Sequence, residues 1–143
     1  MSGDEAVAIA IAFVWFGMVV AISFVETPLK FRAPDVTLRV GLGIGRLVFR
    51  ALNTVEAMFA VAIVITLVVG DSPTASAVSA VVAVASLVVQ LVVVRPGLTR
   101  RSDAVLAGEV APRTRSHHAY IALELVKVVA LLVAGITLLA HAA

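Results

Sequence analysis

Four long apolar runs constrain this chain more than any other feature. They cover residues 6–25, 51–69, 75–94 and 119–140, and the first and third contain no charged residue. A helix that crosses the ~30 Å apolar core of a bilayer needs about 20 apolar residues, and each run meets that length. Strands are not expected, because the runs lack the alternating polar positions of a membrane barrel. We therefore predict an all-α fold, a polytopic four-transmembrane-helix bundle that forms a single membrane domain over residues 1–143.

The composition agrees with a membrane protein. Of the 143 residues, 62% are hydrophobic and only 14% are charged, whereas about 25% of a soluble domain is charged. This leaves too little polar surface to cover a water-soluble globule. The chain has no cysteine, which excludes disulfides, thiolate metal ligands and thiol nucleophiles. No Lys or Arg precedes the first apolar run, so we expect that run to be a retained helix and not a secretory signal.

The basic residues predict an orientation. Ten of the eleven Lys and Arg residues flank the apolar runs in two segments, and the N-terminal tail and residues 70–74 have none. By the positive-inside rule, these two basic segments are cytoplasmic, and both termini lie outside a cell (inner) membrane. Basic residues at membrane edges contact anionic lipid headgroups, so the predicted partner is the lipid bilayer. No aromatic platform supports binding of nucleic acid. The ten residues are Lys30, Arg32, Arg39, Arg46, Arg50, Arg95, Arg100, Arg101, Arg113 and Arg115.

Proline and glycine residues predict the helix ends. Thr27-Pro28 and Pro34 are expected to end the first helix, and Pro96-Gly97 the third. Ser72 is expected to cap the N-terminus of the third helix, with Pro73 at its first position. Because the connection at residues 70–74 is short, the second and third helices should be antiparallel neighbours.

Polar residues form a stripe along the last apolar run. His117, Tyr120, Glu124 and Lys127 follow one another at spacings of 3, 4 and 3, which places them on one face of a helix. Ionisable side chains inside a membrane are costly and usually face the bundle interior or a wet cavity. This face is therefore expected to point into the protein.

The second run carries a matching polar face, formed by Arg46, Asn53 and Glu56. At 1.5 Å per residue, Glu56 and Glu124 both lie roughly 9–10 Å inside the cytoplasmic ends of their helices. We therefore predict that side chains from separate helices meet at one level. The predicted cluster consists of Glu56, Glu124 and Lys127, surrounded by Asn53, Tyr120, His117 and Glu26.

Three interpretations of this cluster stay open. It can be a structural network that fixes helix register. It can be a site that binds an ion, a proton or a polar headgroup in a cavity open to the cytoplasm. It can also supply Glu56 or Glu124 as the general acid of an enzyme that acts on a lipid or isoprenoid. The leading prediction is a non-enzymatic, transporter-like or accessory membrane protein that works as a homo-oligomer or as a subunit of a larger complex.

The histidines argue against a metal or haem centre within one protomer. His117 and His118 point about 100° apart on a helix, so they cannot share a metal as an i,i+4 pair would. His141 lies at the opposite membrane face. We predict no cofactor and no metal site, and keep a protein that handles haem, porphyrin or metal as an alternative.

Two further features concern packing. Ser79, Ala83, Ser86 and Gln90 make a seam of small or polar residues in the third run, which favours close approach of helices. Trp15 falls in the middle of the first run, where its ring can fill the bundle centre and its N–H needs a partner.

The chain resembles a family of small four-helix membrane proteins of unknown function that includes the animal transmembrane protein associated with cisplatin resistance. The resemblance rests on Trp15-Phe16-Gly17, on the exit from Phe24 to Pro28, on the start of the second helix near Gly45 to Phe49, and on a histidine that opens the last helix. That family tends to carry Asn where this chain has Glu124, so the resemblance assigns no role to that position. A weaker resemblance extends to copper-resistance D and HemJ-type proteins. HemJ-like proteins hold haem through a histidine in the first helix, which this chain lacks.

Overall fold

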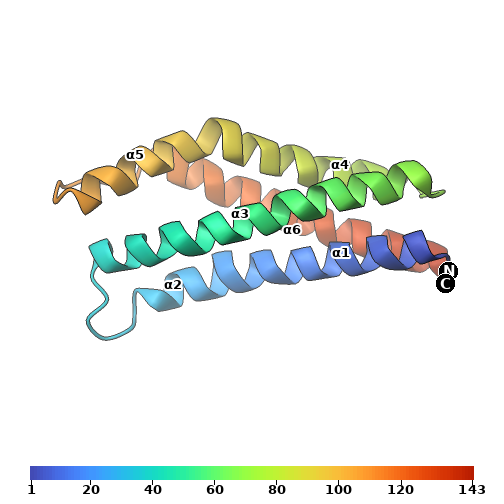
Figure 1. Ribbon diagram of the computed structural model, residues 1–143, viewed down its shortest axis with the longest axis horizontal. Coiled ribbons are helices and arrows are strands. Elements are labelled where there is room, and N and C mark those ends of the chain that lie inside the picture. The colour runs from blue at the N-terminus through green and yellow to red at the C-terminus, as the bar shows by residue number, and fades with distance from the viewer.

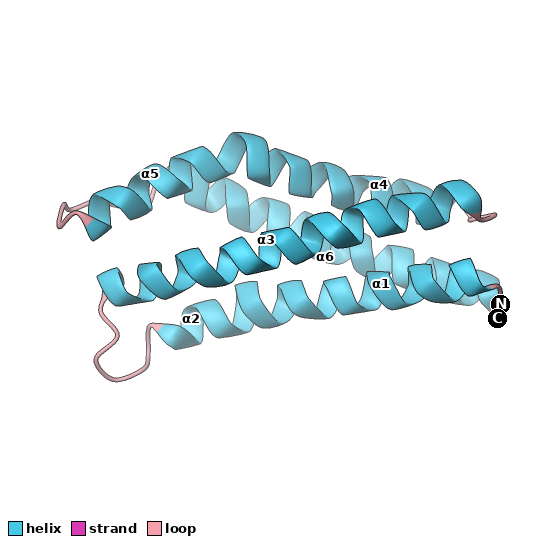
Figure 2. Ribbon diagram, in the orientation of Figure 1, coloured by secondary structure: helices cyan, strands magenta, loops and turns pink.

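A computed structural model describes all residues 1–143 and confirms the four-helix bundle (Figure 1). The first membrane helix comprises α1 (Gly3–Val19), the π-helical η1 (Val20–Glu26) and α2 (Thr27–Lys30). The second is α3 (Leu38–Val69). The third comprises α4 (Thr74–Val89), η2 (Gln90–Val94) and α5 (Arg95–Leu106), and the fourth is α6 (Arg115–Ala142). Only short loops join them (Figure 2).

All four helices extend beyond the apolar runs from which they were predicted. The largest difference is in the second helix, which begins at Leu38 and not near residue 51. Hydropathy detects only the apolar part of a helix, whereas α3 begins within the preceding basic segment. Its start is set by Thr37, whose Oγ1 accepts a hydrogen bond from the N–H of Val40 at 3.2 Å, the usual contact of an N-cap.

The predicted stops at Pro28 and Pro96 are wrong, because the helix passes through both prolines, although the first helix does end before Pro34, at Lys30. Proline lacks an N–H, and its ring collides with the carbonyl four residues earlier. Here a wider π turn precedes each proline: the N–H of Thr27 donates to the Ile22 carbonyl, and the N–H of Arg95 donates to the Gln90 carbonyl. These five-residue hydrogen bonds let each helix continue to Lys30 and Leu106.

The predicted cap at Ser72 is also wrong. The third helix begins at Thr74, and Pro73 itself occupies the N-cap position without a side-chain hydrogen bond. The short turn at residues 70–73 nevertheless reverses the chain, so that α3 and α4 run in opposite directions (Figure 1).

The bundle has two distinct ends. Both termini and the α3–α4 turn lie at one end, which we call the terminus end, and the loops at residues 31–37 and 107–114 lie at the other, the loop end (Figure 1). The α6 helix packs against both α1 and α4, and α1 also packs against α3. At one close approach, a Cβ added at Gly135 of α6 would lie 2.9 Å from the Phe13 ring of α1. A side chain at position 135 would therefore require the Phe13 ring to move.

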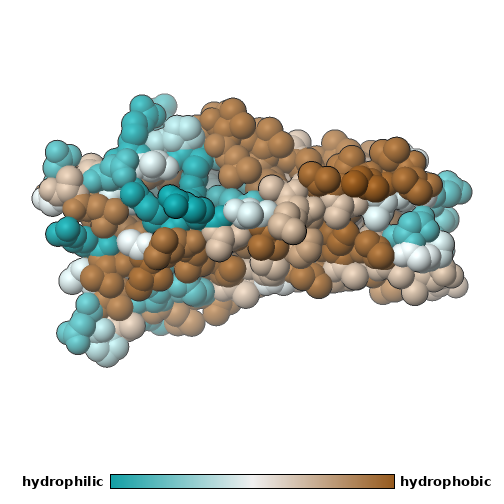
Figure 3. Space-filling view, in the orientation of Figure 1, coloured by the Kyte–Doolittle hydropathy of each residue, from teal (hydrophilic) through white to brown (hydrophobic).

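The outer surface is apolar over most of its length. Many large aliphatic side chains are exposed, including Val68 at 79% and Val92 at 68%, and hydrophobic surface covers the middle of the molecule in Figure 3. Hydrophilic surface gathers at the loop end and in a smaller area at the terminus end. All four helices are long and apolar enough to cross a membrane. We conclude that the chain is a multi-pass membrane protein.

Candidate functional site: a buried charge cluster

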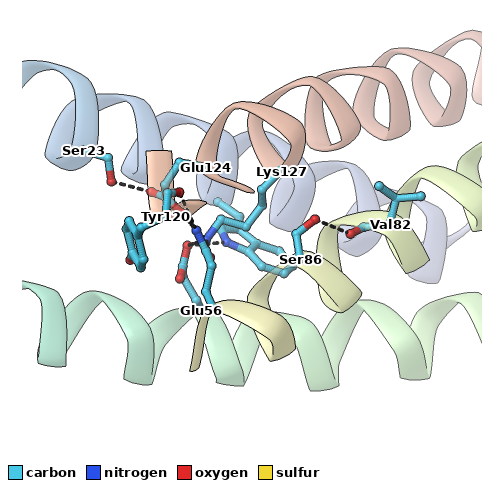
Figure 4. A network of polar contacts seen from close by, with 9 residues as sticks. Ser23, Glu56, Val82, Ser86, Tyr120, Glu124 and Lys127 are labelled. Atoms are coloured by element: carbon cyan, nitrogen blue, oxygen red, sulfur yellow. Dashed lines mark hydrogen bonds and ion pairs between the residues drawn. The ribbon is translucent and has the colours of Figure 1, made fainter. Parts of the chain in front are cut away.

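Lys127 lies at the centre of a buried charge cluster. Its Nζ is 2.7 Å from Glu56 Oε1 and 2.6 Å from Glu124 Oε1. The side chains of Lys127 and Glu56 are fully buried, and that of Glu124 is 2% exposed. Figure 4 shows the two carboxylates converging on the ammonium group from α3 and α6. The prediction that these three residues meet is therefore correct.

The first and third membrane helices complete the cluster through their π-helical segments. Gln90, at the start of η2, donates from Nε2 to Glu124 Oε1 at 2.7 Å and accepts from Lys127 Nζ at 2.7 Å. Ser23, in η1, donates to Glu124 Oε2 at 2.5 Å (Figure 4). All four helices thus meet at Glu124 and Lys127. We use the name "buried cluster" for Trp15, Ser23, Glu56, Gln90, Glu124 and Lys127.

Trp15 supplies the sixth side chain. From the sequence, its ring was expected to fill the bundle centre and its N–H to require a hydrogen-bond partner, but that partner was not predicted. Its ring is completely buried, and Nε1–H donates to Glu56 Oε1 at 3.1 Å. This contact gives Glu56 Oε1 two donors, because the same oxygen also faces Lys127. The ring of Phe59 packs against the indole with 6.4 Å between the centroids.

Gln90 and Ser23 were missed for a local reason. Gln90 was expected only in the packing seam of the third run, and Ser23 was not among the predicted members of the cluster. An inserted π turn adds a residue to the helical repeat, so the inward position after Val19 becomes Ser23. The only feature of the sequence that indicates these π turns is the proline that follows each of them, because a helix can continue through a proline when a π turn precedes it.

Three buried polar atoms near the buried cluster have no hydrogen-bond partner. They are Glu56 Oε2, Asn53 Oδ1 and the Tyr120 hydroxyl. Asn53 lies one turn before Glu56 on the same face of α3, and Tyr120 lies one turn before Glu124 on α6. The Tyr120 ring packs edge-on against Phe49 with 5.9 Å between centroids. Asn53 and Tyr120 therefore lie beside the buried cluster but do not bond to its carboxylates.

His117 and Glu26, the other two predicted members, lie outside the buried cluster. Glu26 pairs with Lys30 at 3.5 Å, one helical turn along the same helix. His117 is half-buried, and its ring stacks edge-on against that of His118, with 5.6 Å between centroids. The two side chains are too near the loop end to reach Lys127.

A cavity of about 470 Å³ connects the loop end with the buried cluster. Ser23, Tyr120 and Glu124 border it, and so does His117. Because Glu124 lies seven residues beyond His117 on α6, the cavity reaches about 10 Å into the bundle. Its wall is strongly basic, because it includes Lys30, Arg46, Arg95, Arg101 and Arg113. An ion or a polar group could approach Glu124 along this route.

The charged groups do not form a metal site. No three His, Cys, Asp or Glu side chains are arranged so that they could hold a metal ion. At the terminus end, His141 Nε2 lies 3.8 Å from Glu5, far along the bundle from His117 and His118. His141 is thus too far from His117 and His118 to share a haem iron with either of them within one protomer.

No family model, curated protein or solved structure matches this chain. The proposals below therefore rest on the geometry of the buried cluster and of the surfaces around it.

Proposed function

We propose that the protein is a transporter-like or accessory membrane subunit that binds one proton at the buried cluster. The supporting observation is that Lys127 places its ammonium between two buried carboxylates, at 2.7 and 2.6 Å. With all three groups ionised, the buried cluster carries one unbalanced negative charge. A net charge inside the apolar core is costly, and a bound proton removes it.

The hydrogen bonds favour Glu56 as the group that takes the proton. Lys127 uses its three N–H donors on Glu56, Glu124 and Gln90. Both oxygens of Glu124 accept hydrogen bonds, the second from Ser23. Glu56 Oε2, in contrast, has no donor. A proton on this oxygen neutralises the excess charge, and the unpartnered Asn53 Oδ1, one turn away, is a suitable acceptor for it.

The cavity at the loop end gives the proton a route. It borders Glu124 and opens among the basic residues of the loop end. By the positive-inside rule, we propose that this end faces the cytoplasm of a cell membrane and that both termini face outward. Exchange would then occur with the cytoplasmic side. We further propose that the protein acts as a homo-oligomer or within a larger complex, which would cover part of its exposed aliphatic surface.

Infrared spectroscopy of the purified protein in lipid nanodiscs tests the proposal. The wild type should show the carbonyl stretch of a buried, un-ionised carboxylic acid at neutral pH, and Glu56→Gln should abolish it. Glutamine has nearly the shape of the neutral acid, so this variant should fold. Glu26→Gln is the matched control, because it removes a carboxylate outside the buried cluster and should leave the band unchanged.

Two results would contradict the proposal. One is a spectrum without an un-ionised acid band in the wild type, and the other is a band that survives in Glu56→Gln. A band removed by added Na⁺ or K⁺ would instead assign the site to a monovalent metal cation.

A further inference from the structure

A second surface feature lies apart from the buried cluster. The α3 helix and the third membrane helix are separated by a lateral groove of about 940 Å³. In Figure 3, hydrophilic surface covers the seam between α3 and α5 at the loop end and gives way to hydrophobic surface farther along. The groove opens on the outside of the bundle, where lipid surrounds the protein.

The groove is basic at one end. Three arginines line it there: Arg46 and Arg50 from α3, and Arg95 from α5. Arg46 is paired with Asp103, whereas Arg50 and Arg95 have no carboxylate within ion-pair distance. The hydroxyl of Thr99 lies on the same wall. Two unpaired guanidinium groups beside a hydroxyl suit a phosphate group, which accepts several hydrogen bonds at once.

Beyond Asn53 and Thr54, which follow the arginines on α3, the rest of the groove is apolar. Along α3 it is lined by Ala57, Met58, Val61 and Ile65, and Leu91 lines the opposite wall. Fifteen residues separate Arg50 from Ile65, which is about 22 Å along the helix. Half of the apolar core of a bilayer is about 15 Å thick. The groove from Arg50 to Ile65 is therefore long enough to hold a headgroup and an acyl chain within one leaflet, and its apolar part, from Ala57 to Ile65, extends about 12 Å along the helix.

We infer that this groove binds one anionic phospholipid, with its phosphate at Arg50 and Arg95 and one acyl chain along α3. The order of the groove, basic at the membrane edge and aliphatic toward the midplane, matches the order of groups in such a lipid. A transmembrane helix from a partner would fill the aliphatic part but would leave the two arginines unneutralised. The charge complementarity thus favours a lipid.

Native mass spectrometry of the purified full-length protein tests the headgroup contact. Wild-type protein should retain one phosphatidylglycerol, and phosphatidylcholine should bind at least tenfold more weakly. R50Q/R95Q should lower the affinity for phosphatidylglycerol roughly 30-fold, since each arginine near an anionic lipid changes affinity about fivefold. R32Q/R39Q is the matched control. It removes the same charge from the loop end but does not touch the groove, so it should change affinity less than threefold.

A second pair of variants tests the acyl chain. Ala57 is exposed and lines the groove, whereas Ala51 is exposed on α3 and does not. Ala57→Trp should displace the lipid, and Ala51→Trp should not. This pair also keeps the inference testable if R50Q/R95Q fails to fold.

Several outcomes would overturn the inference. These are equal binding of the two lipids, equal effects within either variant pair, displacement by inorganic phosphate alone, and a wild-type dimer that buries the groove without lipid. None of these outcomes bears on the infrared band of Glu56, so the two proposals fail independently.

Discussion

Replacement of Lys127 by methionine removes the only cation of the buried cluster. Methionine is of similar length and apolar, so the variant keeps most of the packing volume. It leaves Glu56 and Glu124 without their shared ammonium at 2.7 and 2.6 Å, and Gln90 without its donor at 2.7 Å. Breaking one side of a buried ion pair typically costs about 3–5 kcal/mol, because the remaining charge stays buried and uncompensated.

This loss should be visible in thermal unfolding in detergent. For a chain of this length, 1 kcal/mol corresponds to a shift of about 3 °C, so Lys127→Met should lower Tm by roughly 10–15 °C. Arg32→Met removes an exposed cation without an ion-pair partner and should change stability by less than about 0.5 kcal/mol.

The triple variant Glu56→Leu/Glu124→Leu/Lys127→Met separates a structural network from a proton site. Apolar replacement of a whole buried ion network is often neutral or stabilising. The triple variant should therefore regain most of the Tm that Lys127→Met loses, while the infrared acid band disappears.

If Lys127→Met and Arg32→Met unfolded at the same temperature, the assignment of a buried, mutually dependent ion pair would be wrong.

Three further predictions concern the interior and the orientation. Trp15→Phe removes the indole donor to Glu56 and should cost about 1–3 kcal/mol of stability, measured as a lower Tm. The control is Phe59→Leu, which keeps the donor and should lower Tm less. Equal losses in the two variants would mean that only packing matters. Gly135→Leu places a side chain against the Phe13 ring and should destabilise the α1–α6 contact by about 1–3 kcal/mol, and an unchanged Tm would contradict that close approach. Arg32→Cys and Arg100→Cys should be labelled by a membrane-impermeant maleimide only in inside-out vesicles, and labelling in intact cells would reverse the proposed orientation.

The sequence was sufficient to predict the charged centre of the site. Counting residues inward from the basic loops put Glu56 and Glu124 at the same depth, and the i,i+3 spacing of Glu124 and Lys127 placed both on one face of α6. These inferences hold because both helices are regular α-helices over the relevant turns. Side-chain depth and facing then follow from residue number alone.

The residues that were missed, or placed wrongly, depend on departures from that regularity. Ser23 lies inside a π-helical segment, where the usual repeat favours Ile22, and Gln90 lies at the start of another, on the face of the predicted packing seam, so that its contacts with Glu124 and Lys127 and not its facing were missed. Glu26 lies at the far end of η1 and pairs locally with Lys30. The start of α3 was placed about 13 residues late for another reason, since apolar run length reports lipid contact and not the extent of helix.

The two π-helical turns also divide the first and third helices into two phases. In α1 and α4, the inward-facing positions follow one repeat, set by Trp15 and by Ala83 and Leu87. Beyond the inserted residue, the inward positions follow another. Because the π turn absorbs one extra residue, deleting one residue within Val20–Glu26 would restore a regular α-helix and keep the facing of the residues from there to Lys30. The parts of each helix on the two sides of the inserted turn thus keep their own inward faces, with the turn as the joint between them.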